Sequence, residues 1–351
     1  MSGLIVISDV VASALAEGKP VVALETTVVT HGLPHPEGVR AAAEIENDIA
    51  ARGVMPATIG VLDGRIRVGL TRVEIERLAR EAVIERPAPA VPAPERSERT
   101  TESAAERPAG APRALAAGSS GTTKLNLSNL AAQLASGGPG STTVAATMFV
   151  ASRVGIEVFA TGGIGGVHRG ANETGDISAD LFALARYPVA VVCAGAKAVL
   201  DLDKTVEMLE TLGVPVLGVA TDEFPAFYRR SSGLPVDRRF DGIEDLAGAV
   251  RAHFQLGLGT GVVVANPIPE ECEMPLELYE HALAASLADV ARDVVRGRGV
   301  TPFLLERLRD FTASESVFSN RALLRNNAQV AADLATALAA SRARGTTSSS
   351  G

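Results

Sequence analysis

The apolar positions of this chain form short continuous runs, which alternate with longer segments where apolar residues recur every three or four positions. Continuous runs are typical of strands buried on both faces, and the wider spacing is typical of helices. Strands are predicted at residues 21–24, 57–62, 65–68, 157–160, 189–193, 214–218 and 261–265, and helices at residues 38–52, 71–84, 141–154, 178–185, 205–212 and within 276–339. This alternation predicts a layered α/β fold with a largely parallel sheet.

The stretch 85–121 breaks this pattern. It begins with a Pro/Ala-rich run and continues with mixed charges, Ser, Thr and Gly, without apolar periodicity. Such a composition buries too little apolar surface to offset the entropy of ordering. We therefore expect one domain over residues 1–340, interrupted by a disordered insertion at 85–121 and followed by a flexible tail at 341–351.

Charge and composition restrict the possible partners. The formal net charge is −8, so a global basic field for nucleic acid or an anionic membrane is absent. No apolar stretch is long enough to span a bilayer, and the first residues lack the basic region of a signal peptide. Cys193 and Cys272 indicate neither a disulfide framework nor a zinc cluster. We expect a cytoplasmic protein with a small-molecule ligand.

Polar residues follow directly after several predicted strands, at 25–27, at 161–163, at Lys197 and at Asn266. Ligands of α/β sheets bind at the carboxyl ends of the strands. Stability alone does not explain reactive groups at four separate strand ends, so we expect an active site at this edge of the sheet.

Two of these residues have side chains suited to catalysis. Lys197 lies in a turn of small residues, where loss of hydration would lower the pKa of its amine and make it nucleophilic toward a sugar carbon. An ordinary surface lysine is the other interpretation. Glu25 follows an apolar strand, where a half-buried carboxyl is a competent general acid. A helix-capping or ion-paired glutamate explains that position equally well.

The stretch 161–170 is glycine-rich and contains His168 and Arg169. It lacks the last glycine of a dinucleotide-binding fingerprint and the Gly-Lys-Ser/Thr of a phosphate loop, which argues against a kinase. Close approach of the backbone to an oxyanion and a turn that needs positive φ explain it equally well. Asp176 and Asp180 offer oxygen ligands for a hard cation, although helix capping by Asp176 also explains the pattern.

Motifs spread along the chain resemble the pseudouridine-5′-phosphate glycosidase family. They are Ala-Leu-Glu-Thr-Thr at 23–27, His-Gly-Leu-Pro-His-Pro at 31–36, Thr-Thr-Val-Ala-Ala-Thr-Met at 142–148, Val-Phe-Ala-Thr-Gly-Gly-Ile-Gly-Gly-Val-His-Arg-Gly at 158–170, Asp-Ile-Ser-Ala-Asp at 176–180, Cys-Ala-Gly-Ala-Lys at 193–197 and Val-Ala-Asn-Pro-Ile-Pro at 264–269. The resemblance extends over residues 8–339, apart from the insertion. It implies a three-layer α/β/α core, with a largely parallel or mixed central sheet, and a homotrimer.

The resemblance also implies a reaction, the reversible conversion of pseudouridine 5′-phosphate and water to uracil and ribose 5-phosphate in pseudouridine breakdown. It implies that Lys197 attacks C1′ and forms a Schiff base with the opened ribose, and that Glu25 donates a proton. It further implies that Asp176 holds a Mn²⁺ ion mostly through water, and that Asp180 takes part in proton transfer. The residues implied in substrate binding are Lys124, Val144, Thr161, His168, Ser178, Ala179, Asp180 and Asn320.

The chemistry explains why these residue types are needed. A carbon–carbon glycosidic bond has no leaving heteroatom to protonate, so the carboxylate pair of ordinary glycosidases would not suffice. An iminium at C1′ provides an electron sink, and this demands an amine, an acid–base carboxyl and an anchor for the phosphate.

The chain departs from the family after Lys124, where Leu-Asn-Leu-Ser-Asn at 125–129 stands in place of the usual Ser-Arg-Arg-Asp-like stretch. Two other functions fit part of the pattern. An aldolase-like lyase acting on a phosphosugar would share Lys197 but would not release uracil. A non-catalytic sugar-phosphate-binding protein would have no need of the nucleophile.

Overall fold

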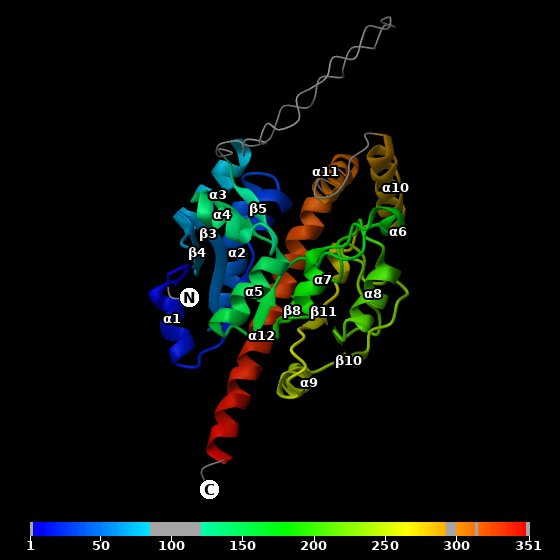
Figure 1. The fold of residues 1–351 in the computed structure, drawn as a ribbon. Helices are drawn as coiled ribbons and strands as arrows, with labels where there is room; N and C mark the ends of the chain where they lie inside the picture. The colour runs from blue at the N-terminus through cyan, green and yellow to red at the C-terminus, as the bar shows by residue number, and fades with distance from the viewer. Residues whose placement is uncertain (1–2, 85–120, 293–299, 313–314, 349–351) are drawn as a thin grey trace, which may run out of the picture.

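A sheet of 11 strands runs through the middle of the molecule in the order β1-β4-β3-β2-β7-β8-β11-β9-β10, with β6 beside β3 and β5 beside β6 (Figure 1). The strands are β1 Ile5–Ile7, β2 Val21–Leu24, β3 Met55–Leu62, β4 Arg65–Val68, β5 Thr123–Leu125, β6 Gly140–Thr142, β7 Val158–Ala160, β8 Ala190–Cys193, β9 Val216–Val219, β10 Arg238–Phe240 and β11 Val262–Ala265. The pairs β3–β4 and β3–β6 are antiparallel, whereas the central pairs β2–β7, β7–β8 and β8–β11 are parallel. The predicted α/β class is confirmed, with a mixed sheet.

The computed structural model describes residues 3–84, 121–292, 300–312 and 315–348. The predicted insertion at 85–121 lies outside these ranges except for Gly121, and so do the last three residues of the predicted tail. Among the described residues, none of the helices has both the length and the apolar character that a membrane span requires.

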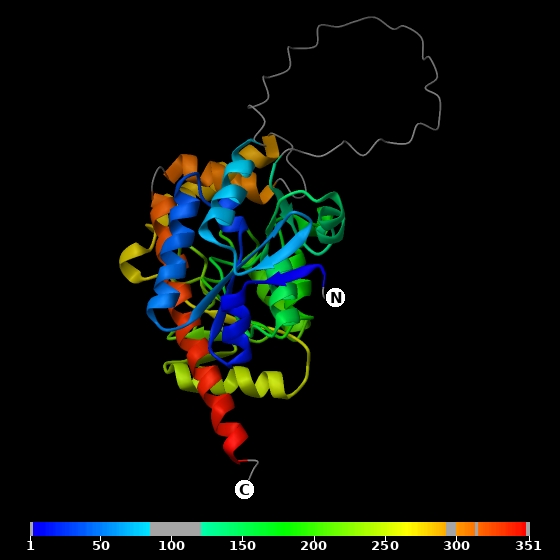
Figure 2. The same ribbon diagram turned by 90° about the vertical axis from the view of Figure 1, so that its left-hand side faces the viewer.

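Helices cover both faces of the sheet, as Figure 2 shows with α2 and α12 on one side and α5 on the other. One layer contains α2 Glu37–Ala51, α9 Ile243–Gln255 and α12 Glu315–Ser348, and the other contains α1 Asp9–Ala16, α5 Val144–Val154, α7 Ala179–Leu184 and α8 Leu202–Thr211. The further helices are α3 Arg72–Ile84, α4 Leu130–Ser136, α6 Ala171–Thr174, α10 Leu276–Arg292, α11 Val300–Thr312, a π-helix at Val28–Gly32 and a 3-10 turn at Glu270–Cys272.

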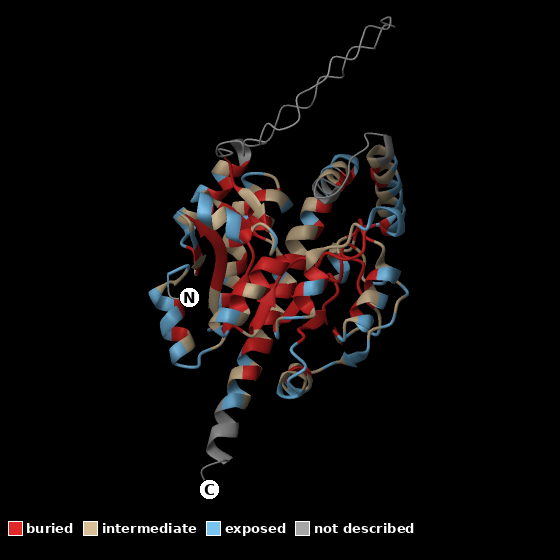
Figure 3. Cartoon of the chain, in the orientation of Figure 1, coloured by how far each residue is buried: buried red, intermediate tan, exposed pale blue. Residues whose placement is uncertain are grey.

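The continuous apolar runs of the strands supply two cores at once. Val21 and Ala23 pack toward α1 and α5, whereas Val22 and Leu24 pack toward α2 and α12. Successive side chains of a strand point to opposite faces, so a strand covered on both sides must be apolar at every position. Figure 3 shows the result, with buried residues concentrated in the central strands and in the helix faces against them.

Several predicted boundaries need correction. The helix predicted at 141–154 begins at Val144, because Gly140–Thr142 forms β6 and pairs with β3 and β5. The predicted tail from residue 341 begins within α12, which continues to Ser348, because the alanine-rich run before it has high helix propensity. The helix predicted at 71–84 begins at Arg72, after Thr71, whose N–H and hydroxyl donate to Glu74 at 2.8 and 2.9 Å in a capping box.

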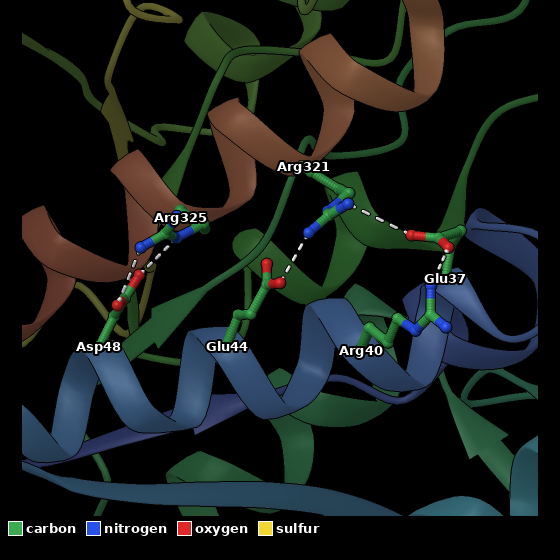
Figure 4. A network of polar contacts seen from close by, with 6 residues as sticks. All are labelled: Glu37, Arg40, Glu44, Asp48, Arg321 and Arg325. Atoms are coloured by element: carbon green, nitrogen blue, oxygen red, sulfur yellow. Dashed lines mark hydrogen bonds and ion pairs between the residues drawn. The ribbon is translucent and has the colours of Figure 1, made fainter. Parts of the chain in front are cut away.

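Helix α12 is fixed to α2 and to the sheet by polar contacts. Arg321 pairs with Glu37 and Glu44, and Arg325 pairs with Asp48, at 2.6–3.2 Å (Figure 4). On the sheet side, the buried Asn327 amide donates to the Thr161 carbonyl at 2.8 Å. These contacts fix where α12 lies along the sheet. They therefore also fix where Asn320 lies relative to the carboxyl ends of the strands.

Candidate active site

A cavity of about 780 Å³ opens at the carboxyl ends of β2, β7 and β8, three neighbouring strands in the centre of the sheet. Of the residues predicted for the site, those that line this cavity are Glu25, Lys124, Thr161, His168, Asp176, Ser178, Ala179, Asp180, Lys197 and Asn320. Strands, loops and α12 that are distant in sequence therefore bring the predicted chemistry to one place.

Glu25 follows β2 and is buried at the base of the cavity. One carboxylate oxygen accepts a hydrogen bond from the Thr161 hydroxyl at the end of β7, and the other accepts one from the Thr27 hydroxyl. Thr161 is in turn held in place because its N–H donates to the Val192 carbonyl at 3.0 Å. The two hydroxyls fix the direction of the carboxyl group, as an acid–base residue requires.

Lys197 lies in the turn that leaves β8, and the glycine-rich loop after β7 holds this turn. The Lys197 N–H donates to the Ile164 carbonyl at 3.0 Å, and the Ile164 N–H donates to the Gly195 carbonyl at 3.0 Å. The Ala194 N–H donates to the Gly162 carbonyl at 2.9 Å. These hydrogen bonds continue the pairing of β7 and β8 beyond the strand ends, and they fix the backbone of Lys197.

Lys124 reaches the cavity from β5, outside the central strands. Burial lowers the pKa of its amine, and the neighbouring charge of Lys197 lowers it further, while Asp180 and Glu25 act in the opposite direction. Asn129 donates to the Lys124 carbonyl at 3.0 Å and fixes the loop that follows the strand. Two ammonium groups in one cavity favour an anionic ligand.

His168 and Asp176 lie side by side across the loop, where the His168 N–H donates to the Asp176 carbonyl at 3.1 Å. Burial lowers the pKa of the His168 imidazole, and Lys124 and Lys197 add to this shift, whereas Asp176 opposes it. The ring is therefore neutral at neutral pH. A neutral imidazole serves both as a hydrogen-bond donor and as an acceptor for a ligand.

A divalent metal would have Asp176 as its carboxylate ligand in this cavity. No group of three or more His, Cys, Asp or Glu side chains that could hold a metal ion occurs in the described part of the chain. This excludes a zinc cage from those residues, but a partly exposed carboxylate in a polar cavity fits a hard cation that keeps most of its water. The donor set therefore fits manganese bound largely through water.

Asp180 is a buried carboxylate with partners on two elements. Its oxygens accept from the Ala145 N–H at 2.9 Å and from the Gly165 N–H at 2.8 Å. A β-carbon at Gly165 would lie 2.7 Å from the same carboxylate and 2.2 Å from the Ser178 hydroxyl oxygen. Glycine is required there for close approach, and Asp180 joins the start of α5, the glycine-rich loop and α7.

Two predicted residues lie elsewhere. The Val144 side chain is fully buried in the core, so any contact with a ligand is left to its main chain at the start of α5. Asn266 does not line the cavity, and the expectation that it contributes to the site is wrong. It is buried and donates to Asn327 of α12 at 2.9 Å. A polar residue at a strand end also serves to fix a helix.

Comparisons with known proteins agree with this geometry. The family described as "Indigoidine synthase A like protein" matches residues 10–107 and 110–337. A pseudouridine-5′-phosphate glycosidase of Methylobacterium nodulans is 47% identical over 337 residues, which cover 95% of this chain and 88% of that protein. Another, of Geobacillus kaustophilus, is 43% identical over 335 residues, covering 95% and 99%. The chain belongs to the pseudouridine-5′-phosphate glycosidase family. It is therefore an enzyme.

Solved structures confirm the fold of this glycosidase family member. The prealnumycin C-glycosynthase AlnA, in complex with ribulose 5-phosphate, aligns with a TM-score of 0.80 and 35% identity, covering 97% of this chain and 99% of that one. An indigoidine synthase A-like protein of Thermotoga maritima aligns with a TM-score of 0.77 and 32% identity, covering 96% and 97%. The expected α/β core, with helices on both faces of a mixed sheet, is thus shared.

Sequence reasoning did not assign roles to other residues that line the cavity of this family member. These are, among others, His31, Asn126, Asn129, Thr143, Phe182 and Phe227. His31 lies within a motif of the resemblance, and Asn126 and Asn129 lie where the chain departs from the family. No pattern in the sequence pointed to Phe227, which reaches the cavity because its segment packs against the distant residue Ala194.

Proposed function

We propose that this enzyme reversibly cleaves the C–C glycosidic bond of pseudouridine 5′-phosphate, giving uracil and ribose 5-phosphate in cytoplasmic pseudouridine breakdown. One observation carries the proposal: a buried carboxyl, Glu25, shares a cavity with two lysines, Lys124 and Lys197. The names of the relatives support the substrate, and ribulose 5-phosphate in the AlnA complex supports a pentose 5-phosphate site.

In the proposed mechanism, the Lys197 amine bonds to C1′ and the ribose ring oxygen leaves as a hydroxyl. The nitrogen lone pair then forms an iminium with C1′, while the electrons of the C1′–C5 bond pass to uracil. C5 of uracil takes a proton, and water hydrolyses the iminium to free Lys197 and ribose 5-phosphate. An amine nucleophile is required because the leaving atom is a carbon with no lone pair to protonate.

Glu25 is the proposed proton donor. The hydroxyls of Thr27 and Thr161 hold its carboxyl at the end of β2, beside the end of β7. A carboxyl fixed in this way delivers its proton along one direction, toward the ring oxygen or the uracil carbon. Asp180 has both oxygens on backbone N–H groups, which supports a role in orienting the substrate segment Ser178–Asp180.

Substrate binding is proposed to depend on Lys124 for the phosphate and on Thr161, His168 and Asn320 for the sugar and base. The Ser178, Ala179 and Asp180 segment and the main chain at Val144 complete the binding site. An entering phosphate would favour the charged form of Lys124 and so oppose the lowering of its pKa by burial and by Lys197.

Asp176 is the proposed ligand of one Mn²⁺ ion per subunit. When bound, the ion would supply positive charge next to the substrate and order water in the cavity. The resemblance to the family further supports a homotrimer, which light scattering tests directly by the mass of the particle.

The test of the proposed function is uracil release from pseudouridine 5′-phosphate, measured by chromatography with Mn²⁺ and with a chelator. Release that depends on the metal and is lost in Asp176→Ala supports both proposals. Full activity without metal contradicts the role of Asp176 alone. Turnover of a phosphosugar without any uracil release from pseudouridine 5′-phosphate would establish the aldolase-like alternative instead.

A further inference from the structure

The turn that carries Lys197 is also held by residues 224–229. The Phe227 N–H donates to the Ala194 carbonyl at 3.0 Å, and Ala226 forms an antiparallel bridge with Gly195. Gly195 has φ +76°, and a β-carbon there would lie 1.9 Å from the Pro225 carbonyl oxygen. The two segments therefore pack backbone against backbone.

Phe227 occupies a position at which hairpins favour glycine. Ala226 and Arg229 exchange backbone hydrogen bonds of 2.9 and 3.3 Å, so Phe227 is the first central residue of a two-residue hairpin. Its φ is +63°, in the left-handed region. Phe227 but not Tyr228 has positive φ, as in a type II′ hairpin, where the first central residue is usually glycine and a bulky side chain is strained.

The aromatic ring of Phe227 explains why the position is not glycine. The residue is 3% exposed and lines the same cavity as Lys197. A β-carbon at Gly163 would lie 2.6 Å from the ring, so ring and glycine loop are in close contact. On its other side the ring packs against Tyr228, with centroids 4.7 Å apart. The hairpin therefore places the ring against the glycine-rich loop, next to the turn that carries Lys197.

Residues after the hairpin fix it to the rest of the fold. Arg229 donates to the Met274 carbonyl at 2.7 Å and pairs with Glu273 at 3.1 Å. Arg230 donates to the Ile268 carbonyl at 2.5 Å. The hairpin is thus attached to the segment after β11 and acts as a rigid support.

We propose that Phe227 is a positioning residue for Lys197. Its amide holds the Ala194 carbonyl, and its ring packs between Gly163 and Tyr228, so that the Lys197 turn stays at one distance from the glycine loop. The proposal rests on the proposed function, because it assumes that Lys197 must reach C1′. A displacement of about 1 Å at a reacting group costs on the order of a hundredfold in rate.

The test compares Phe227→Gly with Phe227→Tyr and with the control Ala220→Gly. Phe227→Gly removes a buried ring but suits the backbone conformation, so the fold should persist with a lowered Tm, which is measured for each variant. Ala220 is exposed and has φ +49°, so Ala220→Gly makes the same backbone change away from the cavity. For each variant, kcat and KM for uracil release are measured, together with the borohydride-trapped adduct formed from ribose 5-phosphate.

We expect Phe227→Gly to lower kcat and the trapping rate about 10- to 100-fold with KM changed less than about threefold. Phe227→Tyr, which keeps the ring, should recover most of the loss, and Ala220→Gly should match wild type. A folded Phe227→Gly with wild-type kcat and trapping, or a parallel loss of stability without the kcat effect, overturns the inference. A wild-type protein that releases no uracil and traps no adduct overturns the proposed function and the inference with it.

Discussion

Two lysines line the same cavity, but the fold holds them differently. Lys197 follows β8 in the centre of the sheet, and hydrogen bonds to the glycine-rich loop and to the 224–229 hairpin fix its backbone. Lys124 lies in a three-residue strand at the margin, where β5 pairs with β6. Its following loop is held mainly by the side chains of Asn126 and Asn129, whose hydrogen bonds stay within the loop and its adjoining strand.

The difference matches the role proposed for each amine. Covalent attack needs reacting atoms about 3–3.5 Å apart and aligned, so small displacements are costly. Attraction between an ammonium and a phosphate falls off only with the inverse of distance, so the anchor tolerates some movement. The centre of the sheet thus carries the group that needs fixed geometry, and the margin carries a point charge.

The largest effect on activity is expected from changes to Lys197, in the centre of the sheet. Lys197→Ala should abolish uracil release, because it removes the amine that is proposed to form the iminium, and Lys197→Arg should not restore it because a guanidinium stays protonated. The measurement is uracil release by chromatography. Lys204→Ala, at an exposed position, is the matched control, and equal activity of the Lys197 and Lys204 variants would remove Lys197 from the mechanism.

Loss of the acid is expected to be smaller. Glu25→Gln keeps the shape and one acceptor oxygen for a threonine hydroxyl but cannot act as an acid, so kcat should fall by about two to four orders of magnitude. KM should change little, because the substrate contacts remain. A Glu25→Gln enzyme with wild-type turnover would assign proton transfer to another group.

Changes at Lys124, at the margin of the sheet, should affect substrate binding and its pH dependence. Burial and Lys197 lower the pKa of Lys124, so in the free enzyme this ammonium loses its proton below the ordinary lysine value of about 10.4. KM for the phosphorylated substrate should therefore rise as pH increases toward that value. Lys124→Arg stays charged and should show a flatter KM profile, whereas Lys204→Arg should follow wild type. A wild-type KM that is constant up to about pH 10 would contradict this.

The smallest effects are expected on stability. They compare a buried side-chain hydrogen bond of α12 with an exposed ion pair of the same helix. Asn327→Ala leaves the Thr161 carbonyl and the Asn266 amide buried without their partner, and should cost about 2–4 kcal/mol of unfolding free energy. Arg325→Ala removes an exposed ion pair with Asp48 and should cost less than about 1 kcal/mol, shrinking in high salt. Urea unfolding at two salt concentrations measures both, and equal costs would contradict the distinction.

The sequence predicted the centre of the molecule better than its margin. The strands β2, β7 and β8 are continuous apolar runs, so their ends could be located, and Glu25, Thr161 and Lys197 lie there as expected. Strands β1, β5, β6 and β10 have three residues each and were missed, because strands this short depend on the hydrogen bonds that a neighbour supplies.

The errors in the site have the same physical origin. Asn266 stands at a strand end like Lys197, yet its amide is used to hold α12, which only tertiary packing decides. Phe227 carries no local pattern, since its positive φ depends on contacts with Ala194 and Gly163 from other segments. Motif order identified the family and pointed to the residues proposed to react, but not to the residue proposed to position one of them.

The most direct test of the account is borohydride reduction of the enzyme in the presence of ribose 5-phosphate, followed by peptide mass spectrometry. The chain has four lysines, Lys19, Lys124, Lys197 and Lys204, so the modified residue can be assigned without ambiguity. The account predicts one ribose 5-phosphate adduct on Lys197, absent from Lys197→Ala, which should remain folded. An adduct on Lys124 or on a surface lysine, or no adduct from an enzyme that releases uracil, would contradict it.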